Sequence, residues 1–143
     1  MNPRTFQEFA KELVAKNRPV TLRTAISRAY YATYHVGVAL LETLGFIIPQ
    51  GPGGHGEVPR RLQNSGDADL EVVGRQLENF HRQRIHADYR LDNREVEGVN
   101  TARLWVIQAG QLIQRLDACL ADQTRRARVK QSIREWERKI SRP

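Results

Sequence analysis

The sequence predicts an all-α protein: an antiparallel up-and-down bundle of four to five helices with a basic amphipathic C-terminal helix. Apolar residues recur every three or four positions along most of the chain, which is the spacing of one helix face. No segment shows the sustained alternation with β-branched residues that is typical of a sheet. The expected helices span residues 5–16, 22–44, 57–64, 69–88 and 93 to about 122, so the bundle is assigned to residues 1–122 and the tail to residues 123–143.

The first two helices have recognisable ends. Pro19 disfavours helical geometry in the residue before it, so the first helix is expected to stop there. Gly45 suits the position just past the end of the second helix. The expected inward side of the first helix carries Phe6, Phe9 and Leu13.

Residues 46–56 join the second and third helices and are rich in helix breakers. Such a segment is expected to form a loop. Long loops are either exposed connectors or functional lids, and both interpretations stay open here. The breakers are Pro49, Gly51, Pro52, Gly53, Gly54 and Gly56.

The last long helix carries two adjacent apolar stripes, which indicates burial by more than one neighbour, either in a core or at a subunit interface. One stripe follows a heptad pattern. Its neighbour consists of Trp105, Leu112 and Cys119. The heptad stripe consists of Val99, Ala102, Val106, Ala109, Ile113, Leu116 and Leu120.

Length and cysteine content favour one domain in a reducing compartment. A chain of 143 residues can bury a core without a covalent staple. The lone Cys119 cannot form an intramolecular disulfide, so a cytoplasmic location is expected. The N-terminus lacks a signal-peptide pattern, and no apolar run is long enough to span a bilayer, so no membrane association is expected.

The net charge of +7 is concentrated at the C-terminus. Residues 124–143 contain eight Lys and Arg against two Glu, so six of the seven excess charges lie there. Any electrostatic attraction for nucleic acid is therefore restricted to the tail and to local patches. The tail also carries an apolar stripe that would pack on protein, so it could dock a partner or clasp a dimer as well as contact RNA. The candidate tail contacts are Arg125, Arg126, Arg128, Lys130 and Trp136.

Polar residues also fall on the expected inward faces of two helices. Arg28, Tyr31 and His35 share one face of the second helix. On the other helix, Arg84 continues an apolar stripe, and a buried guanidinium needs partners. Asp88 at i+4 would satisfy Arg84 structurally, whereas antiparallel packing would bring Tyr31 or His35 near it and form a pocket. Both alternatives stay open.

Three segments resemble the signature of small prokaryotic HEPN (higher eukaryote and prokaryote nucleotide-binding) domains. Residues 27–35, Ser-Arg-Ala-Tyr-Tyr-Ala-Thr-Tyr-His, resemble the family's S-R-A-Y-Y-A-x-F-H. Residues 55–58, His-Gly-Glu-Val, are similar to H-S-G-V, and residues 84–89, Arg-Ile-His-Ala-Asp-Tyr, to R-x-x-A-D-Y. The resemblance covers residues 22–120 and implies a helical HEPN bundle that assembles as a homodimer.

The resemblance also frames the question of catalysis. Ribonucleolytic HEPN domains carry an arginine, four to six residues and a histidine, and they cut RNA without metal. Aligning Tyr89 with the family's tyrosine puts Arg82 at the arginine and Ala87 at the histidine. The family's catalytic histidine is therefore missing, and both His86 and His81 stay open as bases at displaced positions. The candidate catalytic set is Arg82, Arg84 and His86. Arg75 and His81 satisfy the spacing but diverge by about 120° on a helix.

No metal or cofactor is expected. His81 and His86 are five residues apart, one more than the spacing that puts two ligands on one face. The Gly-rich loop lacks the Lys-Ser/Thr of a phosphate-binding loop.

The expected function is a non-catalytic or weakly catalytic HEPN-type module of a prokaryotic stress, defence or toxin–antitoxin system, binding RNA, a nucleotide or a partner protein. The alternative is a metal-independent ribonuclease toxin paired with a nucleotidyltransferase antitoxin. The candidate binding residues are Arg28, Tyr31, His35, Arg84, Asp88 and Tyr89.

Overall fold

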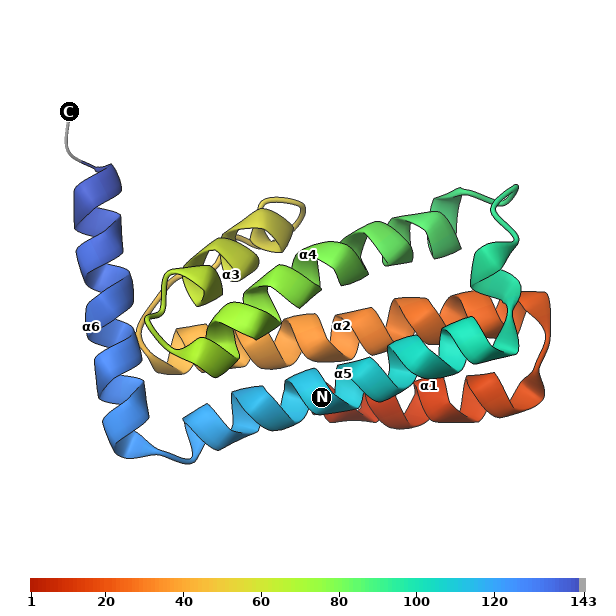
Figure 1. The fold of residues 1–143 in the computed structure, drawn as a ribbon, viewed down its shortest axis with the longest axis horizontal. Coiled ribbons are helices and arrows are strands. Elements are labelled where there is room, and N and C mark those ends of the chain that lie inside the picture. Colours follow the sequence, from red (N-terminus) through yellow and green to blue (C-terminus); the bar gives the residue numbers. More distant parts are fainter. Residues whose placement is uncertain (142–143) are drawn as a thin grey trace.

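The computed structural model describes residues 1–141 and confirms the all-α prediction (Figure 1). Residues 142–143, which include Arg142 of the basic tail, lie outside the described residues. The described chain forms helices and turns and contains no strand. Its elements are α1 (Arg4–Lys16), α2 (Pro19–Thr43), α3 (Gly54–Gln63), α4 (Ala68–Tyr89), the short 3-10 helix η1 (Glu95–Glu97), α5 (Val99–Leu120) and α6 (Gln123–Ile140).

The four long helices α1, α2, α4 and α5 run up and down beside one another (Figure 1). Helix α2 is central, since it packs against α1, α4 and α5. Its Leu22, Ile26 and Leu40 are almost fully buried. Both predicted stripes of α5 contribute to this core, because Leu112 and Cys119 are buried alongside the heptad positions.

Three helix boundaries differ from the expectation. Helix α2 begins at Pro19, because the first helical position does not need the N–H that proline lacks. Helix α5 begins at Val99, later than expected, since Glu95–Glu97 form a separate 3-10 turn. Helix α3 begins at Gly54, three residues earlier than expected and inside the segment expected to form the loop. The break before α6 lies at the expected boundary after residue 122, where the side chain of Asp122 caps the new helix by accepting from the Arg125 N–H at 3.1 Å.

The inward face of α1 also differs from the prediction. Leu13 is buried as expected, but Phe9 is 45% exposed and Gln7 is buried instead. The Nε2 of Gln7 donates to the carbonyl of Val106 on α5 at 2.8 Å, whereas its buried Oε1 has no partner among the described residues.

Helix α6 turns across one end of the bundle (Figure 1). Val129 and Ile133, part of the apolar stripe that could have docked a partner, are buried on the chain's own bundle. Arg125 donates to both carboxylate oxygens of Asp67 at 3.0 Å, beside the start of α4. The Ser132 hydroxyl donates to the Asn64 carbonyl at 3.2 Å, so α6 is attached at several points.

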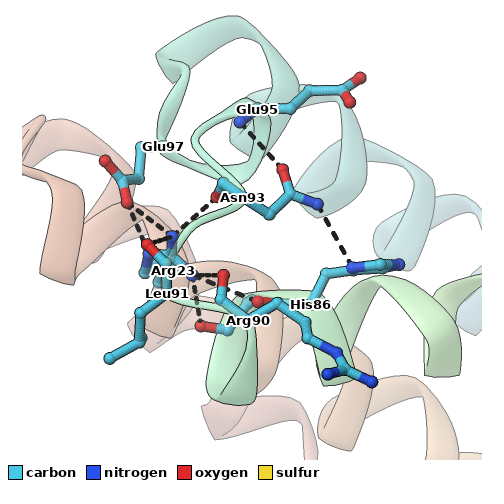
Figure 2. A network of polar contacts seen from close by, with 8 residues as sticks. Arg23, His86, Arg90, Leu91, Asn93, Glu95 and Glu97 are labelled. Atoms are coloured by element: carbon cyan, nitrogen blue, oxygen red, sulfur yellow. Dashed lines mark hydrogen bonds and ion pairs between the residues drawn. The ribbon is translucent and has the colours of Figure 1, made fainter.

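A buried arginine ties the end of α4 to the following turn. Arg23 of α2 donates to both the Glu97 carboxylate, at 2.6 and 2.8 Å, and five backbone carbonyls between residues 86 and 93 (Figure 2). The last carbonyls of a helix have no intrahelical partner, so this guanidinium satisfies acceptors that would otherwise be unpaired. It therefore fixes the C-terminal end of α4 against α2.

Candidate functional site

Antiparallel packing of α2 on α4 brings the predicted binding residues together. The Ser27 hydroxyl donates to the Asp88 carboxylate at 3.1 Å. One turn along α2, the Tyr30 ring packs against Phe80 and His81, with ring centroids 5.7 and 5.5 Å apart.

Two arginines lie against the same tyrosine ring. The guanidinium carbons of Arg28 and Arg84 are 5.1 and 5.3 Å from the centre of the Tyr31 ring. Tyr31 also stacks on His35 at 6.1 Å, and Arg84 lies 5.9 Å from the Tyr89 ring. With Asp88, which forms an ion pair with Arg84, all six predicted binding residues are linked by contacts: Arg28, Tyr31, His35, Arg84, Asp88 and Tyr89.

The hydrogen-bonding capacity of Arg84 is poorly used. Its side chain is only 9% exposed, and its buried Nε has no partner among the described residues. The closest partners of its terminal nitrogens are His81 Nε2 at 3.4 Å and an Asp88 oxygen at 3.6 Å. Charge-assisted hydrogen bonds are normally about 2.7–2.9 Å long, so neither contact is a strong one. The structural pairing with Asp88 exists, but it leaves most of the guanidinium unsatisfied.

Four aromatic residues that the sequence analysis left outside both candidate sets form the centre of the site: Tyr30, Tyr34, His55 and His81, called here the tyrosine–histidine cluster. The Tyr30 hydroxyl and His55 Nδ1 are hydrogen-bonded at 2.6 Å. The His55 ring stacks on Tyr34 at 4.5 Å and on His81 at 4.9 Å. The resemblance at residues 55–58 and the i, i+4 spacing of the two tyrosines were the sequence signals for these residues.

A glycine permits this packing. Gly54 begins α3 directly beside Tyr34, and a Cβ atom there would lie 2.7 Å from the Pro49 carbonyl oxygen and collide with the tyrosine hydroxyl. The absence of a side chain therefore lets the loop deliver His55 to the cluster.

The cluster keeps its titratable groups neutral. Burial, then the charges of His81, Arg84 and His35, lower the pKa of His55 to about 4. Burial, followed by Arg84 and Arg82, also lowers the pKa of His81. Burial raises the pKa of Tyr30. A guanidinium can only donate, so neutral His81 accepts from Arg84 through Nε2 and carries its proton on Nδ1.

A cleft opens beside the cluster. It has a volume of about 420 Å³ and is lined by rings of α2 and α3, including Tyr31, Tyr34, His35 and His55, with residues 48–51 forming one wall. A second hollow of about 440 Å³ lies toward the N-terminus of α1 and shares His35 with the first. The two hollows, together called the groove, also share Val38 and Glu42. The lining of the groove includes aromatic rings in both hollows, with Tyr34 and His55 in the first and Phe6 in the second.

The three candidate catalytic residues do not converge within the chain. Arg82 is exposed and donates to Asn79 on its own helix. His86 Nδ1 lies 3.3 Å from the Asn93 side chain, beside the Arg23 network (Figure 2). Arg84 is two positions from each, about 200° around α4, and faces α2.

Helix α6 divides the predicted tail contacts. Arg125 is bound to Asp67 and Asp69, and Arg126 donates to the Leu120 carbonyl. Trp136 is partly buried against the bundle, with the Arg60 guanidinium 5.4 Å from its ring. Arg128 remains exposed and Lys130 half-exposed. Thus the first two arginines and the tryptophan already serve contacts within the chain.

No cluster of three or more His, Cys, Asp or Glu in residues 1–141 could hold a metal ion. Among the described helices, none combines the length and the apolar character needed to cross a membrane.

Comparison with known proteins identifies no relative: no protein-family model, curated protein or solved structure matches the chain.

Proposed function

We propose that this chain is a HEPN-type module that binds RNA or a nucleotide in the groove between α2, α3 and the loop joining them. The observation that carries the proposal is the unsatisfied guanidinium of Arg84, which packs on the ring of Tyr31, a residue that lines the cleft. The sequence resemblance supplies the biological context, a homodimeric component of a prokaryotic stress, defence or toxin–antitoxin system with no catalysis or only weak catalysis. A nucleotidyltransferase is the partner that this context suggests.

The chemistry of the groove suits a nucleotide. Nucleobases stack on aromatic side chains, and each such stack contributes about 1–3 kcal/mol. Tyr31, Tyr34, His35 and His55 offer such faces along the cleft. A cleft of about 420 Å³ is within the size range of small-ligand sites.

The arginines suit the phosphate of the same ligand. Arg28 is half-buried beside Tyr31, and its buried Nε, like that of Arg84, has no partner in residues 1–141. Planar guanidinium groups bind phosphate through paired hydrogen bonds, which lysine cannot reproduce. A phosphate near Tyr31 would give both arginines the acceptors they lack.

Binding of a fluorescent single-stranded RNA and of a labelled mononucleotide to metal-free protein tests this proposal. We expect Arg84→Lys, which keeps the charge but removes the planar donors, to weaken binding at least tenfold. Arg75→Lys is the matched control, since Arg75 is exposed on the same helix and is expected to leave affinity unchanged. Equal affinity of wild type and Arg84→Lys, or no binding by the wild type, would refute the proposal.

Ribonuclease activity is the second candidate function, favoured by the contact between His81 and Arg84. A histidine whose pKa is lowered is unprotonated at pH 7. Its Nε2 can accept the proton of a 2′-hydroxyl when the RNA replaces the weak 3.4 Å contact with Arg84. A neighbouring arginine can stabilise the charge that develops on phosphorus. This arrangement replaces His86 with His81 as the base of the proposed reaction.

Incubation of labelled transfer RNA with metal-free protein separates the two candidate functions on denaturing and native gels. Cleavage that is lost in His81→Gln but kept in His86→Gln would establish a ribonuclease with His81 as its base. Cleavage lost only in His86→Gln would return the role to the original set of Arg82, Arg84 and His86. Intact but shifted RNA in all samples supports binding alone.

A further inference from the structure

Helix α6 presents a fixed outer face. Its inner side is held by buried Val129 and Ile133, by the paired hydrogen bonds from Arg125 to Asp67, and by an ion pair from Glu137 to Arg61 at 3.1 Å. Side chains about half a turn away from that inner side therefore point away from the bundle.

Arg134 and Arg138 are exposed on that outer face, and half-buried Lys130 lies at its edge, with its Nζ near Gly45 at the end of α2. Lys130, Arg134 and Arg138 are called here the basic stripe. These residues recur every four positions, which places successive side chains about 6 Å apart along the helix. Within residues 1–141, none of the three has a carboxylate within ion-pair distance. Glu137 lies beside the stripe, but its carboxylate is bound to Arg61. The stripe is thus a line of positive charge without intramolecular partners among the described residues.

The surface around the stripe is hollowed. A shallow depression of about 1020 Å³ is lined by the basic stripe together with Ala127, Gln131, Glu137 and Ser141. Its lining contains three cationic side chains, small or amide side chains and no large apolar residue. Such a surface suits a hydrated anionic chain better than an apolar protein face.

We propose that the basic stripe is a second RNA contact, outside the groove, that binds the phosphodiester backbone independently of sequence. This inference rests on the proposed function, because it assumes that the groove binds a segment of the same RNA. It also changes the assignment of the tail contacts from Arg125 and Arg126, which serve the fold, to Arg134 and Arg138.

An anionic membrane surface is the competing occupant, and the orientation of α6 argues against it. Helices that lie on membranes insert an apolar face between the lipids. The apolar face of α6 is turned inward, where Val129 and Ile133 are 1% and 0% exposed. Only Ile140, at the far end, is substantially exposed among the apolar residues of that face.

The test is the salt dependence of RNA binding by a Lys130→Gln/Arg134→Gln/Arg138→Gln variant. Each contact between a cation and a phosphate of a single strand contributes about 0.7 to the slope of log K against log salt concentration. We expect the variant to reduce the magnitude of that slope by about 2, while its affinity for a mononucleotide stays that of the wild type.

Two further variants make the result specific. Lys16→Gln/Arg75→Gln/Arg103→Gln removes the same charge from exposed positions elsewhere and is expected to keep the slope within experimental error. Lys130→Arg/Arg134→Lys/Arg138→Lys keeps the charges of the stripe and is expected to show the wild-type slope. Wild-type affinity of the Gln variant for a mononucleotide excludes misfolding as the cause of its smaller slope.

Different results would overturn RNA binding by the basic stripe and ligand binding in the groove. The proposal for the basic stripe alone would be overturned if the stripe variant and the Lys16→Gln/Arg75→Gln/Arg103→Gln control gave equal slopes while mononucleotide binding stayed intact. Loss of binding to phosphatidylglycerol vesicles, with RNA binding unchanged, would assign the stripe to membranes instead. A wild type that binds neither RNA nor mononucleotide would overturn both proposals.

Discussion

Arg23 and Arg84 are buried to the same extent, with side chains 10% and 9% exposed, but their surroundings differ sharply. Arg23 makes seven hydrogen bonds to one carboxylate and five carbonyls (Figure 2). Arg84 has an unpaired Nε and no partner closer than 3.4 Å. A buried guanidinium is costly unless its donors are satisfied, so only Arg23 is explained by the fold.

The comparison separates two uses of a buried charge. The Arg23 guanidinium closes the end of α4, where the Glu97 carboxylate and free carbonyls converge on it. The Arg84 guanidinium faces aromatic rings that attract a cation but accept no strong hydrogen bond. We infer that Arg84 is held for an anionic ligand.

The largest expected effect on stability comes from Arg23→Met. This change leaves the Glu97 carboxylate and several carbonyls buried without a donor. Breaking a buried ion pair of this kind costs about 3–5 kcal/mol, so we expect the free energy of unfolding to fall by about that amount. Urea unfolding followed by circular dichroism measures it. An unchanged midpoint would show that the network is not a structural element.

A smaller effect is expected for Glu97→Gln. The amide oxygen can still accept from Arg23, but the charge that balances the guanidinium is lost. We expect the free energy of unfolding to fall by about 1–2 kcal/mol, less than for Arg23→Met. The same urea titration decides this order, and the reverse order would contradict the assignment of the carbonyls as main acceptors.

Acidification tests the surroundings of Arg84, because two histidines near it have lowered pKa values. The pKa of His55 is about 4 in the folded protein, below the ordinary value of 6.5, and that of His81 is also lowered. The unfolded chain therefore takes up protons first as pH falls. The stability contributed by the neutral histidines is fully present above about pH 6.5 and is lost progressively toward pH 4.

Arg84→Met should weaken this pH dependence, because Arg84 is one cause of the lowered pKa values of His55 and His81. Titration of the histidine ring protons by NMR should show both pKa values moving up toward 6.5 in Arg84→Met. Arg75→Met serves as the control on the same helix. Histidine pKa values that do not move in Arg84→Met would mean that burial alone keeps the rings neutral.

The smallest effect is expected for Asp88→Asn. The Asp88 carboxylate lies 3.6 Å from Arg84 and accepts the Ser27 hydroxyl, a bond that an amide oxygen can also accept. A partly exposed ion pair contributes about 0–1 kcal/mol, and we expect a loss within that range. A loss as large as that of Arg23→Met in the urea titration would restore the structural explanation of Arg84.

The sequence predicted the features that depend on local periodicity, which are the helices and the residues that share one helix face. Helical stripes located the bundle, and the face shared by Arg28, Tyr31 and His35 follows from helical spacing alone. Arg23 could not be assigned in this way, because its acceptors lie 63 to 74 residues along the chain. The exposure of Phe9 likewise depends on which neighbours α1 meets.

The centre of the site also depends on contacts between residues that are far apart in the sequence. Spacing could not show that His55, on a short helix after a loop, stacks on His81. The break before α6 lies at the predicted boundary between bundle and tail, although neither glycine nor proline marks it, and the Asp122 side chain caps the new helix there.

The most direct test of the central claim is the free energy of unfolding of Arg84→Met without any ligand. Burying a charge whose hydrogen bonds are unsatisfied costs free energy, and an apolar side chain of similar length removes that cost. We predict a free energy of unfolding equal to or above that of the wild type, measured by urea unfolding at pH 7.5 beside Arg23→Met. A decrease matching that of Arg23→Met would show that Arg84 serves the fold and would contradict its assignment to a ligand.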